Sequence, residues 1–197
     1  ELDEKYPSYE KIAASVIAKD AGNWFSTFTI DKGEKDGIKE NMNVMAGSGL
    51  VGIVKEVGPN YAKVRSIIDD SSQVSAMVST TKDNFTVSGD LKSMNTSKVI
   101  TFSGLRDEDD EVEVGDPVVT SYVSDLYQQG IMIGYVASIE KNPNNLTKSG
   151  TITPIVDFEH LENVLVIKNL KETGNTTGTK ADNSESADDN KDASKEK

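Results

Sequence analysis

The sequence predicts an all-β fold, either a sandwich or a barrel. Its 197 residues contain many short segments in which apolar and polar residues alternate, a pattern typical of half-buried strands. Turn residues separate these segments, most clearly between Trp24 and Val57, where Lys32-Gly33 and Asp36-Gly37 interrupt the alternation. Long helical patterns are missing, which disfavours a parallel α/β fold.

The first half of the chain divides at these turn residues. A helical turn is expected over 1–6, because Pro7 stops a helix. This turn belongs to a segment, 1–10, that is expected to be the end of a helical stem. A second helical turn is expected over 34–40, after Lys32-Gly33. An apolar segment rich in β-branched residues begins at Gly49 and is interrupted by Gly52. The expected strands of this half are 11–18, 24–31, 43–46, 49–57, 61–68, 74–79 and 84–89.

The second half follows the same rule, with gaps that hold Gly, Asn, Asp, Pro or Ser. Its expected strands are 98–103, 117–121, 131–140, 150–157 and 163–168, with a helical turn over 122–128. Residues 171–197 contain no aromatic residue and few apolar side chains, so they cannot offset the entropy cost of ordering and are expected to be a disordered tail.

An internal similarity suggests two related halves. When Gly52 is aligned with Gly134, each glycine is followed by an apolar residue, then a valine, and another β-branched residue three positions later. An apolar pair precedes each segment, Val44-Met45 in one case and Val118-Val119 in the other. The similarity has two explanations at this stage, a duplicated unit or the general likeness of antiparallel strands.

Composition excludes several functions. The net charge is −12, and seven of the ten residues from Asp107 to Asp116 are acidic, so the surface would repel nucleic acid and anionic lipid. The chain has no cysteine, which removes disulfides and thiol chemistry but leaves the compartment open. The longest apolar run, Ile12 to Ala18, is far shorter than the roughly 20 residues that span a bilayer.

The residues expected of an enzyme are missing. His160 is the only histidine, and it lies near the end of the chain, after every candidate serine outside the tail. The catalytic triad of the chymotrypsin-like proteases, which follows the order histidine, aspartate, serine along the chain, therefore cannot be formed. The Gly-x-Ser-x-Gly motif around the nucleophile of α/β-hydrolases does not occur either. We expect no catalytic residue and no cofactor, and interpret His160 as a surface residue between two strands.

No metal site is expected either. The acidic run from Asp107 to Glu111 lacks the spacing with which a calcium loop wraps one ion, so it is interpreted as a solvated acidic hairpin loop.

The order of several motifs resembles that of MreC, the rod shape-determining protein family of bacteria. The likeness covers roughly residues 15–168. It rests on Asn23-Trp24-Phe25, Ile30-Asp31-Lys32-Gly33, Asp36-Gly37-Ile38, Met42-x-Val44, Gly49-Leu50-Val51-Gly52-x-Val54, Asp69-x-x-Ser72-x-Val74-Ser75-Ala76, Gly115-Asp116-x-Val118-Val119-Thr120-Ser121, Gly130-Ile131-x-Ile133-Gly134-Tyr135-Val136, Val156-Asp157-Phe158 and Val164-Leu165-Val166-Ile167.

The resemblance implies two small six-stranded β-barrels of trypsin-like topology on a short N-terminal helical stem. On this basis residues 11–80 form the first barrel and 81–149 the second, while the last strands, 150–168, complete either the second barrel or the first. It also implies that a short cytoplasmic start, a single membrane helix and a coiled coil precede residue 1, which would place this part on the extracytoplasmic side of the cell membrane.

The function implied by the resemblance is a non-catalytic scaffold that organises peptidoglycan synthesis during cell elongation. Its implied partners are a second copy, through the stem, together with MreB, MreD, RodA and the penicillin-binding transpeptidases. The alternative is a cryptic or degenerate cell-wall hydrolase or protease of double-β-barrel fold.

Aromatic and apolar residues in predicted turns are the candidate partner-binding residues. Tyr122, Leu126 and Tyr127 lie between the strand 117–121 and Gly130, and Trp24 and Phe25 open the strand 24–31. Large side chains of this kind are common anchors of protein interfaces. The segment 122–128 departs from the glycine-rich sequence usual in MreC, so its loop shape is left open.

Overall fold

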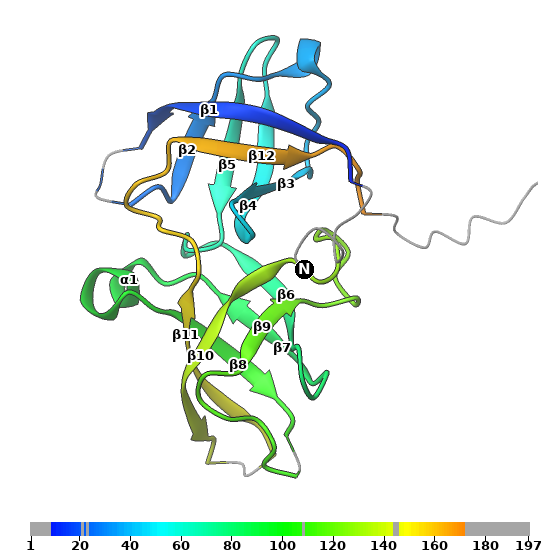
Figure 1. The fold of residues 1–197 in the computed structure, drawn as a ribbon. Coiled ribbons are helices and arrows are strands. Elements are labelled where there is room, and N and C mark those ends of the chain that lie inside the picture. The colour runs from blue at the N-terminus through cyan, green and yellow to red at the C-terminus, as the bar shows by residue number, and fades with distance from the viewer. Residues whose placement is uncertain (1–8, 21, 23, 108, 144–145, 172–197) are drawn as a thin grey trace, which may run out of the picture.

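The computed structural model describes residues 9–20, 22, 24–107, 109–143 and 146–171. The expected stem lies mainly outside the described residues, as does nearly all of the expected tail. In the described part the chain is mostly β-strand with a closed six-stranded β-barrel and one short α-helix, so the all-β prediction is confirmed (Figure 1). Across the described residues, no helix combines the length and apolar character needed to cross a membrane.

Six strands form the first ring, which is the upper one in Figure 1. Hydrogen bonds join them in the cyclic order β4-β3-β12-β1-β2-β5, and the pairing of β5 with β4 closes the ring. Strand β12, the last strand in the described part of the chain, enters this ring between β1 and β3. The strands are β1 (Lys11–Lys19), β2 (Thr27–Ile30), β3 (Asn43–Ala46), β4 (Gly49–Val57), β5 (Ala62–Ser66) and β12 (Asn163–Ile167).

The other six strands are paired in the same cyclic manner and form the second ring. Their order is β10-β9-β6-β7-β8-β11, and β11 pairs back onto β10. These strands are β6 (Gln73–Val78), β7 (Asn84–Ser88), β8 (Ile100–Leu105), β9 (Pro117–Thr120), β10 (Met132–Lys141) and β11 (Lys148–Pro154). Among the residues that the structure describes, one parallel pairing, Met132 with Gly49, connects the two rings through β10 and β4.

The two cyclic orders correspond strand by strand. Strand β4 has β3 and β5 as neighbours, as β10 has β9 and β11. Gly52 and Gly134 lie at matching places in these strands: a Cβ atom on either one would lie 2.1 Å from a carbonyl oxygen of the next strand, that of Arg65 or of Thr153. Both positions therefore require glycine for the same reason, the close approach of two backbones.

One of the expected helical turns is present and one is not. The segment 34–40 contains a 3-10 turn, η1 (Glu34–Asp36), whereas the segment 122–128 contains turns and bends but no helix. The α-helix, α1 (Leu91–Ser97), lies where the sequence predicts none, because seven residues are too few to show helical periodicity. Asp90 caps it by accepting the backbone N–H of Ser93 at 2.9 Å.

Apolar side chains fill both rings and form one continuous buried cluster. Val54, Val64 and Val166 are fully buried in the first ring, and Val87 and Val118 in the second. Polar contacts also cross between the rings: the Trp24 indole N–H, before β2, donates to the side-chain oxygen of Asn95 on α1 at 2.6 Å. Packing and polar bonds together hold the two rings against each other.

Candidate functional site

The connection between β9 and β10, residues 121–131, is longer than the fold requires. We call it the β9–β10 loop. In the first ring, the corresponding connection between β3 and β4 consists only of residues 47 and 48. Figure 1 places the loop, in yellow-green, at the level where the two rings meet. Long ordered loops on a rigid β scaffold commonly carry function, which makes this loop the first candidate site.

Side-chain hydroxyls give the loop a defined conformation. The Ser121 Oγ accepts the backbone N–H of Val123 at 3.1 Å, and the Ser124 Oγ accepts that of Tyr127 at 2.9 Å. Ser and Thr side chains stabilise turns in this way. Tyr127 is 3% exposed, and its side chain packs into the hydrophobic core beneath the loop. Burial raises the pKa of its hydroxyl to about 12.

Three large apolar side chains of the loop face solvent. Tyr122 is 56% exposed, Val123 58% and Leu126 40%. The loop backbone beneath them is hydrogen-bonded and Tyr127 is buried, so these side chains stand on an ordered base. Apolar groups gathered on such a base are typical of a protein-binding surface.

The five sequence-predicted residues differ in their exposure to solvent. Tyr122 and Leu126 are exposed on the β9–β10 loop, whereas Trp24 and Tyr127 are buried. Phe25 is half-buried, packs edge-on against Phe28 with ring centroids 6.1 Å apart, and has the Lys19 ammonium 4.7 Å from its ring centre. Val123, which follows Tyr122 in the same predicted turn, is exposed as well.

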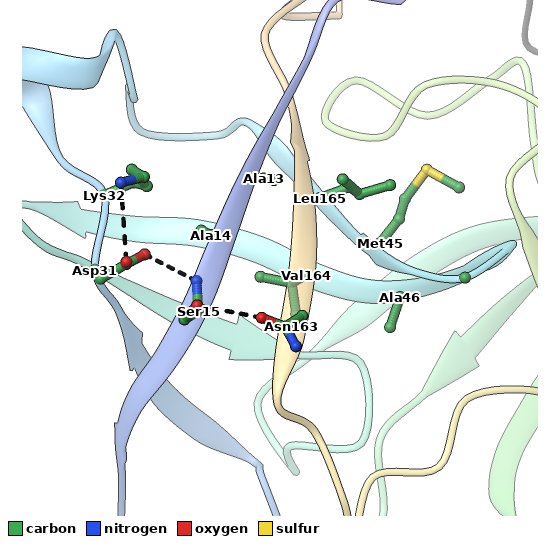
Figure 2. A pocket seen from close by; sticks show the side chains of 11 residues that line it. Ala13, Ala14, Ser15, Asp31, Lys32, Met45, Ala46, Asn163, Val164 and Leu165 are labelled. Carbon is green, nitrogen blue, oxygen red and sulfur yellow. Dashed lines mark hydrogen bonds and ion pairs between the residues drawn. The ribbon is translucent and has the colours of Figure 1, made fainter.

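A shallow hollow of about 450 Å³ lies on the first ring (Figure 2). Its polar groups are bonded to one another: the Ser15 backbone N–H donates to Asp31 at 2.8 Å, and the Ser15 Oγ donates to Asn163 at 3.2 Å. Asp31 also lies 3.8 Å from the Lys32 ammonium. The eleven lining residues contain no histidine or cysteine that could activate a nucleophile there.

His160 lies exposed in the connection between β11 and β12. Its Nδ1 is 2.9 Å from a carboxylate oxygen of Asp157, and that hydrogen bond, followed by the one from the Glu159 backbone N–H, lowers the pKa of Asp157. Ligand atoms of Asp157, Glu159 and His160 lie within 4.8 Å of one another. Glu159 is paired with Lys98 at 3.4 Å, and all three side chains belong to one short, solvated segment.

The acidic run 107–111 is more than the solvated hairpin loop that the sequence predicts. Asp107 is buried and accepts the backbone N–H groups of Glu111 and Val112 at 2.9 and 3.1 Å. Its carboxylate also accepts a hydrogen bond from the ammonium group of Lys148 at 2.6 Å, which makes the two residues an ion pair. Lys148, the first residue of β11, is itself buried and bonds Asp110 as well. No local pattern indicates this pairing, because Lys148 is distant in the chain.

These bonds set the acid behaviour of the loop. Burial alone would raise the pKa of Asp107, but the bonds from Lys148 and from the two backbone N–H groups outweigh it, and the pKa is lowered. Bonds from Lys148 and then Lys141 lower the pKa of Asp110 to about 2. Since both values lie below the ordinary value of about 3.9, the stability they confer is present above that pH and is lost as the pH falls toward 2.

We therefore expect the protein to lose stability between about pH 4 and pH 2. A Lys148→Met variant, which lacks the cation, should lose less stability over the same pH interval. The difference between the melting temperatures of the unmodified protein and the variant should therefore narrow. Thermal unfolding followed by circular dichroism at a series of pH values measures this. A difference that stays constant from about pH 6 to pH 2 would contradict the assignment.

Comparison with known protein families shows to which family the chain belongs. A family model described as "Rod shape-determining protein MreC, barrel core" matches residues 16–168. The chain belongs to the MreC family. The resemblance expected from the motifs is thereby confirmed.

Several MreC proteins align over most of the chain. The cell shape-determining protein MreC of Listeria monocytogenes is 31% identical over 178 residues, which are 89% of this chain and 59% of that protein. The protein of the same description from Bacillus subtilis is 29% identical over 167 residues, 81% of this chain and 57% of that one. The chain thus spans less than two thirds of the length of these MreC relatives.

Solved structures of MreC proteins have the same fold. The Listeria monocytogenes structure superposes with a TM-score of 0.73 at 30% identity, covering 88% of this chain and 86% of that one. MreC from Pseudomonas aeruginosa gives a TM-score of 0.67 at 21% identity, covering 80% and 99%. A complex between Penicillin-Binding Protein (PBP2) and MreC from Helicobacter pylori contains a chain with a TM-score of 0.59 at 14% identity, covering 81% and 100%.

Proposed function

We propose that this chain is the extracytoplasmic part of a non-catalytic MreC scaffold, which organises peptidoglycan synthesis enzymes in an elongating bacterium. The observation that carries the proposal is the β9–β10 loop of this family member, with three exposed apolar side chains on an ordered base. A preformed surface of this kind favours binding, because rigid anchors lose little conformational entropy on association.

The proposed architecture is two related β-barrels of trypsin-like topology, one for each ring. The matching cyclic orders and the paired glycines, Gly52 and Gly134, support this relation. We place the boundary between β5 and β6, earlier than the residue 80 expected from the sequence, because β6 pairs with β7 and β9. Strand β12 then completes the first barrel, and the expected stem, 1–10, lies mainly outside the described residues.

The proposed partner of the β9–β10 loop is a penicillin-binding transpeptidase. A related MreC, that of Helicobacter pylori, has been solved in a complex with PBP2. Further proposed contacts are those of the family as a whole: self-association through the stem, and the proteins MreB, MreD and RodA. A membrane helix preceding residue 1 would anchor this part at the outer face of the cell membrane.

The alternative, a cell-wall hydrolase, is less well supported. His160 makes its hydrogen bond to Asp157 on an exposed segment, where solvent screens both groups. General acid–base catalysis depends instead on groups converging on a substrate pocket. The scaffold role requires no such pocket.

Replacing Tyr122 and Val123 together with serine should weaken binding to the purified PBP2 of the same bacterium by roughly 10- to 100-fold, because interface anchors of this size typically carry about 1–3 kcal/mol. Both side chains are exposed, so the melting temperature should stay nearly unchanged. Surface plasmon resonance with the PBP2 ectodomain measures the affinity.

Tyr135 provides the matched control. It is an exposed tyrosine at 45%, but it lies in β10 rather than on the loop. Tyr135→Ser should therefore leave the affinity within about twofold, as expected for a residue outside the energetic centre of an interface. Equal affinity of the double variant and the unmodified protein would reject the loop as the docking surface.

A further inference from the structure

A buried amide of the first ring holds the β9–β10 loop of the second ring. Asn43, the first residue of β3, is 1% exposed. Its side-chain Nδ2 donates to the backbone carbonyl of Leu126 at 2.9 Å, and its Oδ1 accepts the backbone N–H of Gln128 at 2.7 Å. One side chain thus bonds the loop on both sides of Tyr127.

The chemistry of this contact requires an amide. The loop offers one acceptor and one donor, and a neutral amide supplies the matching donor and acceptor together. An aspartate at position 43 would place a carboxylate against the carbonyl of Leu126, and an apolar residue would leave both loop groups without this partner. A buried polar group that loses its partner is costly, so the loop would shift toward water.

Gln128 extends the contact toward both ends of the described chain. Its Nε2 donates to the carbonyl of Asn169, just after β12, at 3.0 Å, and its Oε1 accepts the Tyr9 hydroxyl, just before β1, at 3.4 Å. The Thr120 hydroxyl donates to the carbonyl of Gln128 at 2.6 Å. Asn43 and Gln128 therefore join the loop to three segments of the first ring.

The bonds within the loop and the bonds to Asn43 have different effects. Those from the serine hydroxyls fix the shape of the loop itself. Those from Asn43 fix its place relative to the first ring, where the strand pairing between rings is limited, among the described residues, to Met132 and Gly49. The place of Leu126 is thus set from the opposite ring, whereas Ser121, next to Tyr122, is bonded to Asn84 and to the carbonyl of Ser75 in the second ring. The Asn43 bonds therefore fix where Leu126 lies relative to Tyr122 and Val123.

We propose that Asn43 is a positioning residue for the docking surface, which is assembled correctly only when the two rings are in contact through it. The inference rests on the proposed function of the loop. It adds a regulatory consequence: any change in the relative orientation of the rings that breaks the Asn43 bonds would also change the surface offered to the transpeptidase.

Asn43→Ala tests this, with Val44→Ala as the control. Val44 is the next residue of β3, is fully buried, and its truncation destabilises the same strand without removing a bond to the loop. Amide hydrogen exchange is measured on both variants by mass spectrometry. In Asn43→Ala, the amides around the two bonds, 126–128, should exchange at least about tenfold faster relative to the rest of the chain, whereas Val44→Ala should show no such selective effect.

Binding to the PBP2 ectodomain completes the experiment. We expect Asn43→Ala to lower the affinity about tenfold under conditions in which both variants are fully folded, and Val44→Ala to retain it. Unchanged exchange of the loop in Asn43→Ala overturns the inference. A second result also overturns it: Asn43→Ala exchanges its loop amides faster but binds the PBP2 ectodomain with unchanged affinity, while the Tyr122 and Val123 double variant has lost binding.

The same measurements separate this inference from the proposed function. If the double variant binds PBP2 normally, the loop is not the docking surface and the positioning role in docking fails with it. If the double variant loses binding while Asn43→Ala behaves like Val44→Ala, the docking surface stands and Asn43 does not position it.

Discussion

Replacing Lys148 with methionine is expected to destabilise the protein by about 3 kcal/mol, because the buried carboxylate of Asp107 loses its cation. Methionine has a similar length and fills the same space, so the loss is mainly electrostatic. Lys148 is 7% exposed, and its ammonium bonds both Asp107 and Asp110. Urea unfolding followed by tryptophan fluorescence gives the free energy directly.

Two variants separate this effect from surface charge. Lys141 also pairs with Asp110, at 2.9 Å, but is well exposed, so Lys141→Met should cost no more than about 1 kcal/mol. The double variant Asp107→Asn, Lys148→Met removes both buried charges and should recover part of the lost stability. A Lys148→Met variant as stable as Lys141→Met would show that the pair contributes no more than an ordinary surface pair.

Alanine at Gly52 or at Gly134 should destabilise the protein by about 3 kcal/mol or more, with poor soluble expression. In each case the new methyl group would lie 2.1 Å from a backbone carbonyl oxygen, that of Arg65 or of Thr153. A strand in a closed ring cannot move away without breaking its pairing on the other side. Melting temperatures and urea unfolding of the purified variants measure the effect.

Gly47→Ala is the appropriate control. Gly47 lies in the short turn between β3 and β4 with φ of +57°, and a methyl group added there would have no heavy atom within 4 Å beyond its chain neighbours. The cost there is only the positive φ, about 1–2 kcal/mol. Similar losses at Gly52 and Gly134, both larger than at Gly47, would support the relation between the rings. Tolerance of alanine at Gly134 alone would argue against it.

The class of fold and the position of most strands are properties of the sequence. Alternation of apolar residues and punctuation by glycine involve only neighbouring residues, so they can be recognised before any tertiary contact is known. The likeness of the segments around Gly52 and Gly134 has the same local origin. The family is recognisable too, because the order of such segments is itself a property of the chain.

Which candidate residues are available to a partner depends on the folded structure. Trp24 and Tyr127 are residue types common among interface anchors, but Trp24 is buried with its N–H bonded to Asn95, and Tyr127 plugs the base of its loop. Helix α1 escapes prediction because seven residues with one capping aspartate carry too little periodic signal. Local pattern does not distinguish an exposed aromatic side chain from a buried one.

Asn43 and Lys148 have no signal in the sequence at all. Asn43 meets Gln128, 85 positions later, and Lys148 meets an aspartate 41 positions earlier. Each is a polar residue in a strand, which alone predicts exposure to solvent. Burial becomes favourable only because the closed rings bring a matching donor, acceptor or opposite charge to the same place, and this complementarity exists only in the folded chain.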